Sequence, residues 1–291
     1  MATPSLMEVV RRSTRYLADH GSPSARLDAE LLTAHALGLR RLDVYLQHDR
    51  PLREAELAPL RELVRRRGLG EPVAYLVGER EFWGRSLRVT PEVLIPRPET
   101  ELVVERALRW ARASHGAEGQ GLRIADLGTG TGCLAVTLAA ELPGAVVRGS
   151  DLSAAALAVA EENARRLGVS ERVELVEGRW AEPLRGLGPF DLVVSNPPYI
   201  ASAELDAVMR DVRDHEPRLA LDGGPDGLAS YRALLPTLVP LLARAAALVL
   251  EVDAGRAAPV AALVAASFAG AVTTVHADLA GLDRVVEAVR V

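Results

Sequence analysis

The four residues Asn196-Pro197-Pro198-Tyr199 follow directly on the apolar run 190–195. The oxygen of an asparagine side chain can accept one N–H of a planar NH₂ group, and a backbone carbonyl held by the following proline can accept the second. The ring of Tyr199 can stack on the flat group and exclude water. The segment therefore predicts a site that grips an amino or amide nitrogen, although a Pro-Pro turn after a strand is often only a turn.

A glycine-rich segment, Gly128-Thr129-Gly130-Thr131-Gly132, separates an expected strand over 122–125 from an expected helix over 133–141. Glycines let the backbone turn sharply and approach a ligand closely. Asp151 ends the next expected strand, 145–149, about 20 residues further on, where a Rossmann-type fold brings a carboxylate to ribose hydroxyls. Asp126 precedes the first glycine, and the segment lacks the Gly-x-Gly-x-x-Gly pattern of nicotinamide sites, which favours S-adenosylmethionine as the cofactor.

Together these motifs resemble those of the glutamine N5-methyltransferases that modify peptide-chain release factors. The resemblance spans most of the chain and includes the segments 78–84, 94–101, 216–217 and 223–227. Asn-Pro-Pro-Tyr alone is shared with N6-adenine methyltransferases of nucleic acid. The Pro-Arg-Pro-Glu-Thr stretch within 94–101 is therefore the segment that favours the glutamine methyltransferases over the adenine methyltransferases. The chain departs from the family pattern at Arg179, where an acid is common, and at 251–255, a loosened Glu-x-Gly stretch.

The resemblance implies a role for each matching residue. Residues Gly128 to Gly132 would wrap the methionine end of S-adenosylmethionine, Asp151 would hold the ribose, and Trp180 would lie near the adenine. Asn196 is the first residue we expect to act in catalysis and also to touch the cofactor, and its neighbours Pro197, Pro198 and Tyr199 complete the grip on the substrate. Phe82, Arg97 and Glu99 match positions at the substrate-side wall.

Plainer interpretations of these residues stay open at this point. Trp180 is equally compatible with a core position, and Phe82 with the packing of a hairpin. Arg97 and Glu99 are equally compatible with an exposed ion pair. The implied substrate is the glutamine of the GGQ motif in release factors. A ribosomal-protein glutamine, an adenine of nucleic acid, and a catalytically silent scaffold are the alternatives.

Composition limits the class of protein. The 291 residues carry a net charge of −5, which disfavours stable binding along a nucleic-acid backbone, whereas residues 1–80 hold 13 arginines against 11 acidic residues. Cys133 is the only cysteine, so disulfides are excluded. No histidine spacing indicates a metal site. We expect a cytoplasmic monomer without a membrane span or leader, with release factors as the protein partner.

Hydrophobic periodicity predicts three parts. Helical spacing over 5–20, 24–38, 42–48 and 54–68 indicates a small helical domain, 1–75, with Ser24 and Asp43 as helix starts. The family resemblance implies that it is the substrate-recognition domain. Alternation over 74–82 and 86–93 indicates a hairpin bridge, 76–96, with its tip at Trp83-Gly84. Alternating strands and helices over 97–291 indicate the cofactor domain. The predicted fold is α/β: a Rossmann-like class I methyltransferase domain with a mostly parallel seven-stranded sheet, preceded by the helical domain and the hairpin.

Overall fold

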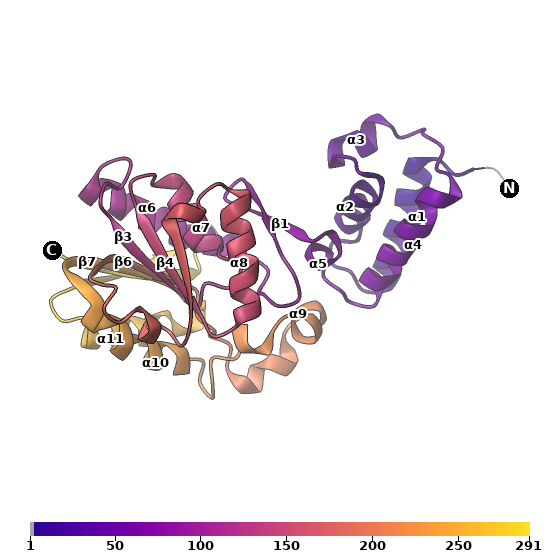
Figure 1. Ribbon diagram of the computed structural model, residues 1–291. Coiled ribbons are helices and arrows are strands. Elements are labelled where there is room, and N and C mark those ends of the chain that lie inside the picture. The colour runs from indigo at the N-terminus through magenta and orange to yellow at the C-terminus, as the bar shows by residue number, and fades with distance from the viewer. Residues whose placement is uncertain (1–2) are drawn as a thin grey trace. The chain divides into compact units, whose positions relative to one another are not determined.

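The computed structural model describes residues 3–291 and separates the chain into two compact units (Figure 1). The first contains the chain up to Glu79 together with Met209–His215. The second contains Arg80–Val208 and Glu216–Val291. The described residues include no helix that is both long and apolar enough to cross a membrane.

The first unit is helical. Its helices are α1 (Leu6–Asp19), α2 (Ala25–Leu37), α3 (Arg41–Leu46), α4 (Glu54–Gly68), α5 (Val73–Val77) and α9 (Arg210–His215). Helix α1 starts at a capping box in which Ser5 N donates to Glu8 at 2.9 Å and Glu8 N donates to the Ser5 hydroxyl at 3.3 Å. Buried leucines and valines of α1, α2 and α4 form one apolar core between the helices.

One predicted helix start was wrong. Asp43 lies inside α3, where its carboxylate accepts the N–H of the capping residue Arg40 at 3.2 Å. An aspartate stabilises either position, because both place a negative charge near the unpaired N–H groups of the first turn. Ser24 does precede α2, and its hydroxyl donates to Asp28 at 2.7 Å.

The hairpin is shorter than its sequence pattern predicts. Residues 74–77, expected to start its first strand, lie in α5, which is capped by Gly78 with φ +81°. A short apolar run does not distinguish helix from strand by periodicity, and burial of Leu76 in the helical core decides for the helix. The strands are β1 (Glu79–Phe82) and β2 (Arg85–Arg88). Trp83 and Gly84 make the expected tip, with φ +51° and +67°, the pair of positive values that suits a two-residue hairpin.

The second unit contains a seven-stranded sheet in the order β5-β4-β3-β6-β7-β9-β8. The strands are β3 (Arg123–Leu127), β4 (Val146–Asp151), β5 (Val173–Glu177), β6 (Phe190–Ser195), β7 (Leu242–Glu251), β8 (Val272–Ala277) and β9 (Asp283–Arg290). The pairs from β5 to β7 are parallel, and β9 runs antiparallel to both neighbours. The predicted mostly parallel seven-stranded sheet is therefore confirmed.

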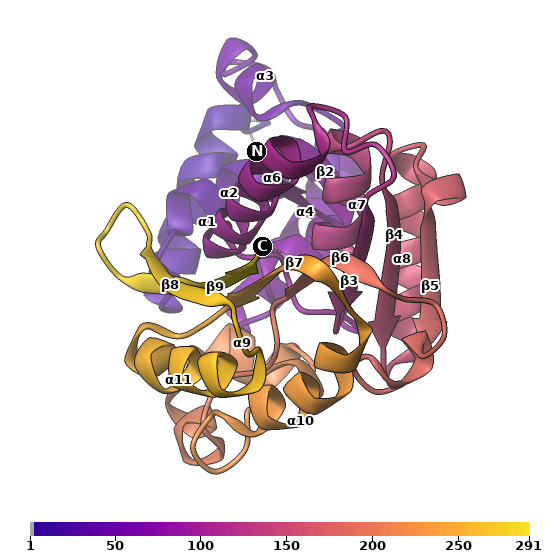
Figure 2. The ribbon, with the colours of Figure 1, turned by 90° about the vertical axis from the view of Figure 1, so that its left-hand side faces the viewer.

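Helices cover both faces of the sheet (Figure 2). They are α6 (Glu101–His115), α7 (Cys133–Glu141), α8 (Ala154–Arg166), α10 (Ala229–Leu238) and α11 (Ala257–Ser267). Neighbouring strand residues face opposite layers, so that Ile124 packs in the core with α6 and α7 whereas Ala125 packs in the core with α10 and α11. The chain runs from β3 outward to β5 and then returns to β6 on the other side of β3. This reversal is the point at which open α/β sheets bind ligands.

Candidate active site

Four parallel strands end side by side at one edge of the sheet, and the predicted site residues follow these ends. The glycine segment follows β3, Asp151 ends β4, Asn196 follows β6, and Glu251 ends β7. The Ser195 hydroxyl donates to the Leu127 carbonyl at 2.5 Å and links the ends of β6 and β3. Sheet topology thus brings the glycine segment and Asn196 to the two sides of the chain reversal.

The glycine segment is held open by its backbone conformation. Gly128, Gly130 and Gly132 have φ of +71°, +54° and +78°, values that residues other than glycine rarely adopt. The N–H groups of Gly128 and Thr129 donate to the Ser150 carbonyl at 2.8 and 3.0 Å. A Cβ at position 132 would lie 3.0 Å from that of Ala160, so this glycine also permits close packing on α8.

Asp126 supports the segment from below. It accepts the Thr129 hydroxyl at 2.6 Å and the Ala135 N–H at 3.1 Å, which fixes the loop to the start of α7. Burial raises the pKa of its carboxyl to about 7, because desolvation outweighs these two bonds and Asp151 adds a like charge. Its Oδ1 has no hydrogen-bond partner among residues 3–291.

Asp151 and Trp180 lie next to the glycine segment. The Asp151 carboxylate accepts the N–H groups of Gly130 and Ser153, both at 2.9 Å. Trp180 has a left-handed backbone, φ +50°, and its carbonyl accepts the Ser150 hydroxyl at 2.6 Å. Its ring lies 3.5 Å from the Cβ position of Gly128. The buried indole N–H has no hydrogen-bond partner within the described chain.

On the other side of the reversal, Asn196 and Tyr199 belong to a network of side chains. The Asn196 NH₂ group donates to the Thr100 hydroxyl at 3.1 Å. The Tyr199 hydroxyl donates to Glu251 Oε1 at 3.3 Å, and burial raises the pKa of this phenol far above its ordinary value, with the Glu251 charge adding to the effect. Pro197, which directly follows Asn196 in the sequence, is buried. The amide of Asn196 is therefore held through its NH₂ group, which leaves its oxygen as an acceptor.

Glu251 is the buried charge of this network. Desolvation raises the pKa of its carboxyl to about 7, the charge of Glu99 adds to the rise, and the hydroxyls of Thr100 and Tyr199 oppose it. Its Oε2 has no partner among residues 3–291. Tyr231 donates to the backbone carbonyl of Glu251 at 2.8 Å and anchors the end of β7.

A second glycine-rich loop, 223–227, packs against the Asn-Pro-Pro-Tyr backbone. Gly223 N donates to the Ile200 carbonyl at 2.7 Å, and a Cβ at position 223 would lie 2.7 Å from the Tyr199 Cα. Only glycine allows this approach. The loop therefore fixes the path of the chain after Asn196.

The residues predicted for the substrate-side wall are placed differently from one another. Arg97 donates to Glu216 at 2.6 Å. Its guanidinium is also close enough to Tyr199 to oppose part of the rise in the pKa of that phenol. The charge of Glu99 acts on Glu251. Phe82, in contrast, is 1% exposed and lies in the core with Leu87. Arg97 and Glu99 therefore lie near the network of Asn196 and Tyr199, whereas Phe82 is used in packing the hairpin.

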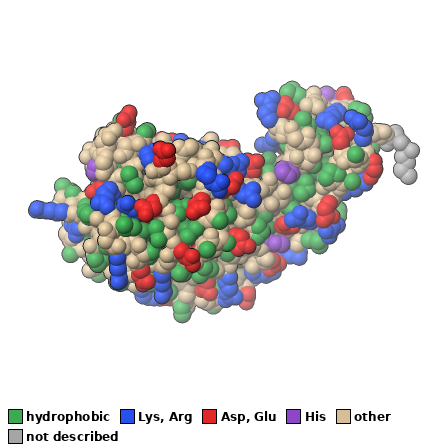
Figure 3. All heavy atoms as spheres, viewed as in Figure 1, with side chains coloured by type: hydrophobic (Ala, Val, Ile, Leu, Met, Phe, Trp, Pro, Cys, Tyr) green, Lys and Arg blue, Asp and Glu red, His purple; other side chains and the backbone are tan. Residues whose placement is uncertain are grey.

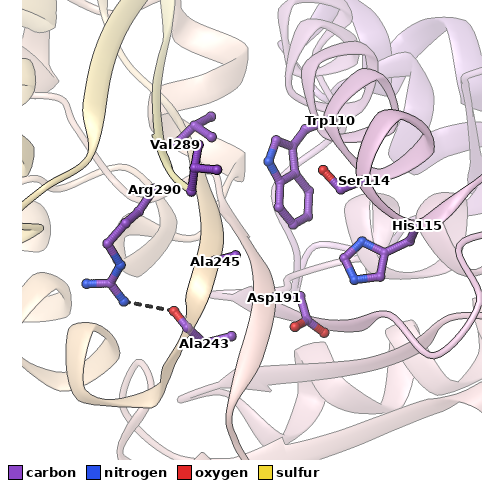
Figure 4. A pocket seen from close by; sticks show the side chains of 9 residues that line it. Trp110, Ser114, His115, Asp191, Ala243, Ala245, Val289 and Arg290 are labelled. Atoms are coloured by element: carbon purple, nitrogen blue, oxygen red, sulfur yellow. Dashed lines mark hydrogen bonds between the residues drawn. The ribbon is translucent and has the colours of Figure 1, made fainter.

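A cavity of about 400 Å³ lies at the opposite end of the sheet (Figure 4). Trp110, Ser114 and His115 on one side face Asp191 and the start of β7 on the other, and Arg290 donates to the Ala243 carbonyl at 2.8 Å. These residues are at the amino ends of β6 and β7, so the cavity is separate from the predicted site. Among residues 3–291 no cluster of three or more histidine, cysteine or acidic side chains has the geometry of a metal site.

Comparisons with known proteins agree with this geometry. The family model "PrmC N-terminal domain" matches residues 8–78, and "Methyltransferase small domain" matches residues 113–224. A release factor glutamine methyltransferase of Geobacter sulfurreducens is 45% identical over 97% of this chain and 95% of its own length. That of Bradyrhizobium diazoefficiens is 45% identical over 91% of this chain and 88% of its own. The chain belongs to the release factor glutamine methyltransferase family.

Two solved structures are similar to this chain. The release factor-specific protein-(glutamine-N5) methyltransferase of Alicyclobacillus acidocaldarius is 35% identical and matches 70% of this chain and 99% of its own, with a TM-score of 0.42. The catalytic domain of hMettl16, solved with a MAT2A 3′UTR hairpin, matches 78% of this chain and 81% of its own at 18% identity and a TM-score of 0.53. The latter likeness concerns the fold alone. Membership of this family identifies the protein as an S-adenosylmethionine-dependent methyltransferase.

Sequence motifs missed two members of the network. Thr100 was part of a recognised segment but had no assigned role, and Glu251 was noted only as a departure from the family pattern. Their involvement depends on the ends of α6 and β7 meeting beside Asn196. A signal was present in the acid that ends the apolar run 245–250, because a carboxyl next to a buried run of this kind is often buried with it.

Proposed function

We propose that this protein transfers the methyl group of S-adenosylmethionine to the side-chain amide nitrogen of a glutamine in peptide-chain release factors, the GGQ glutamine in particular. The observation that carries the proposal is the placement of Asn196, with its amide oxygen left as an acceptor, across the chain reversal from the glycine segment. The names of the relatives supply the identity of the protein substrate.

The residues present fit S-adenosylmethionine. The positive-φ glycines leave room for a ligand close to the main chain, and a Cβ at Gly130 would meet no atom within 4 Å. Asp151 supplies a carboxylate for ribose hydroxyls, and Trp180 an aromatic face and an unpaired N–H for the adenine. When bound, the cofactor supplies a sulfonium methyl group as the electrophile.

The protein's contribution to the reaction is to hold and orient the amide. An amide nitrogen is a poor nucleophile because its lone pair is delocalised into the carbonyl. Asn196 Oδ1 and the carbonyl of Pro197 would accept its two N–H groups, which directs the lone pair toward the methyl group. Positioning of two reacting atoms in this way can lower the barrier by about 7–11 kcal/mol. Tyr199 would cover the flat amide and exclude water, and the proton can leave after transfer.

The helical unit, residues 1–75 in the proposed division, would recognise the protein substrate. A single glutamine offers few contacts, whereas specific protein docking buries about 1,200–2,000 Å². Between α1 and α4 this unit has a groove of about 360 Å³ lined by apolar side chains and by Arg12, Arg61 and Arg65. Arg61 and Arg65 are paired with Glu54 and Glu62, and an acidic segment of the release factor would compete for these two arginines and bind Arg12. On the face shown in Figure 3, basic and acidic side chains are interspersed, in keeping with a cytoplasmic monomer that does not hold nucleic acid stably.

The proposal is tested by incubating the purified protein with labelled S-adenosylmethionine and, separately, a bacterial release factor, a ribosomal fraction and DNA. Label should enter the release factor and be lost when its GGQ glutamine is replaced by alanine. Label that enters only the ribosomal fraction or only DNA would overturn the substrate assignment.

Docking by the helical unit is tested with the double variant Arg12→Glu and Arg65→Glu. It should raise KM for the intact release factor several-fold at low salt, and leave kcat and S-adenosylmethionine affinity unchanged. The matched control is Arg244→Glu, a charge reversal in the second unit, at the start of β7. An unchanged KM in the double variant would exclude the groove as the docking surface.

A further inference from the structure

The hydrogen-bond network behind Asn196 has a direction. Thr100 is 1% exposed, and its hydroxyl accepts the Asn196 NH₂ group at 3.1 Å. A hydroxyl has one hydrogen and two acceptor positions. While Thr100 accepts from Asn196, its own hydrogen needs a second acceptor.

Glu251 is the acceptor placed to take this hydrogen. Its carboxyl is 1% exposed and interacts with the Thr100 hydroxyl, which stabilises the charged form. Tyr199 donates to its Oε1 at 3.3 Å, and Oε2 has no hydrogen-bond partner in the described part of the chain, so it can still accept one. An ionised carboxylate accepts hydrogen bonds and donates none. When Glu251 is ionised, a bond between it and Thr100 can only run from the Thr100 hydroxyl to the carboxylate, which leaves Thr100 as the acceptor for Asn196.

This polarity decides which end of the Asn196 amide faces the reaction. The two ends of a side-chain amide are nearly equal in size, so shape alone does not select between NH₂ and oxygen. With NH₂ toward Thr100, the oxygen faces away and is free to accept an N–H of the substrate. In the reverse orientation NH₂ would face the substrate NH₂, two donors that cannot bond.

We propose that Thr100 and Glu251 are positioning residues that fix the Asn196 amide with its oxygen toward the substrate glutamine. The inference rests on the proposed function of Asn196 as the grip on the substrate amide. Thr100 and Glu251 act through Asn196 and need not touch the substrate or the cofactor.

The surroundings of Glu251 determine when this orientation is enforced. Five ionisable side chains from five different segments act on or are affected by its charge: Glu99, Cys133, Tyr199, Tyr231 and Arg284. Of these, only Arg284 is a cation that favours the ionised form. Protonation of Glu251 would give it a hydrogen to donate to Thr100, and the direction of the network would no longer be fixed.

The first test compares Thr100→Val with Thr100→Ser and with Thr137→Val. Valine matches threonine in shape but removes the hydroxyl, and serine restores it. Thr137 is a fully buried threonine of α7 whose hydroxyl has no partner among residues 3–291, so its replacement is a matched control for burial of the change. Each variant is checked for folding by thermal denaturation and for S-adenosylmethionine affinity by calorimetry, with kcat and KM measured on the release factor.

Thr100→Val should lower kcat about tenfold to a hundredfold, the range that misplacement of a reacting group produces, with cofactor affinity within about twofold of the parent. Thr100→Ser should recover most of the loss, and Thr137→Val should leave kcat unchanged. Parental kcat in folded Thr100→Val, or equal losses in the valine and serine variants, would overturn the inference.

Glu251→Gln provides an independent readout if Thr100→Val does not fold. A glutamine can donate as well as accept, so the orientation of Asn196 is no longer imposed. In the parent, kcat should rise with pH through about 7 as Glu251 ionises, and in Glu251→Gln kcat should be lower and this limb absent. A limb that persists unchanged in Glu251→Gln would overturn the inference.

The Asn196 side-chain NH₂ signals in ¹⁵N NMR spectra do not require activity. They should titrate near pH 7 in the parent and not in Thr100→Val or Glu251→Gln. If the parent methylates no release factor but these signals respond as stated, the orientation of Asn196 is supported and the proposed substrate is wrong. Signals insensitive to both substitutions would contradict the network itself.

Discussion

The two halves of the candidate site are built from different parts of the chain. After β3 and β4, the half assigned to the cofactor is made of backbone: three glycines with positive φ, N–H groups bonded to the Ser150 carbonyl, and one carboxylate that accepts a loop N–H. After β6 and β7, the half assigned to the substrate is made of side chains that bond to one another. The first half should therefore be sensitive to added volume, and the second to a change in hydrogen-bonding groups.

Each half nevertheless contains one buried carboxyl whose pKa is raised to about 7. Asp126 holds the glycine segment to α7, and Glu251 faces Thr100 and Tyr199. In both, one oxygen has no hydrogen-bond partner among residues 3–291. Both halves of the candidate site thus contain a buried carboxyl that bonds to neighbouring groups, although the two halves differ in every other respect described above.

Removal of Asn196 should have the largest effect. Asn196→Ala is expected to lower kcat about 100-fold to 1,000-fold, or about 2.7–4 kcal/mol, the scale of one lost hydrogen-bond partner in a transition state. Because Asn196 is also expected to touch the cofactor but the glycine segment and Asp151 are unchanged, S-adenosylmethionine affinity should fall by no more than a few-fold. Rapid-mixing methyl transfer and calorimetry measure the two quantities. Turnover within a few-fold of the parent would exclude the proposed grip on the amide.

The buried acid of the substrate half predicts a pH dependence of stability. The folded state raises the Glu251 pKa from 4.5 to about 7, so between these values the native protein keeps a proton that the unfolded chain has lost. The contribution of this bound proton to the free energy of unfolding is complete below pH 4.5 and is lost as the pH rises through 7. At about 1.4 kcal/mol per pKa unit, this carboxyl should account for about 3 kcal/mol.

Urea unfolding of the parent and of Glu251→Gln at pH 4.5 to 8 measures this contribution to the free energy of unfolding. The variant should lose less stability than the parent as pH rises over this interval. Glu161→Gln, at an exposed position of α8, should reproduce the parent profile. Identical slopes for the parent and Glu251→Gln would show that Glu251 keeps an ordinary pKa.

Loss of Asp151 should affect the cofactor half alone. Charge-assisted hydrogen bonds are worth about 1.5–3 kcal/mol, so Asp151→Ala should weaken S-adenosylmethionine binding about tenfold to a hundredfold. Calorimetry should show no such change for Asp49→Ala, whose carboxylate is 89% exposed in the helical unit. Unchanged affinity in folded Asp151→Ala would remove this residue from the site.

The smallest effect, and the sharpest test of sensitivity to volume, is expected from Gly130→Ala compared with Gly21→Ala. Both glycines have positive φ, +54° and +81°, and at both an added Cβ meets no atom within 4 Å. Each substitution should cost about 1–2 kcal/mol of stability for the left-handed backbone. Only Gly130→Ala should also lower cofactor affinity, by about tenfold, because its methyl group would occupy space assigned to the ligand. Equal affinities in the two variants would contradict this assignment.

The sequence by itself determined the features that depend on local chemistry. Glycines at 128, 130 and 132 predicted a loop open to a ligand because only glycine adopts these φ values easily, and the alternation of apolar runs predicted a parallel sheet whose strand ends share one edge. Asn196 could be singled out because Asn-Pro-Pro-Tyr follows a buried strand in a chain that also carries the glycine segment upstream. The short run 74–77 was predicted wrongly because its pattern fits both a helix and a strand.

Only the tertiary structure decided what depends on residues far apart in the chain. Thr100 and Asn196 are separated by 96 positions, and Tyr199 and Glu251 by 52, so no local pattern could show that their side chains bond. Burial assigned Phe82 to the core and raised the pKa of two acids, because the free energy of an ionised group depends on the solvent that the whole fold excludes. Local spacing thus predicts which groups are available, and packing decides their partners, orientation and charge.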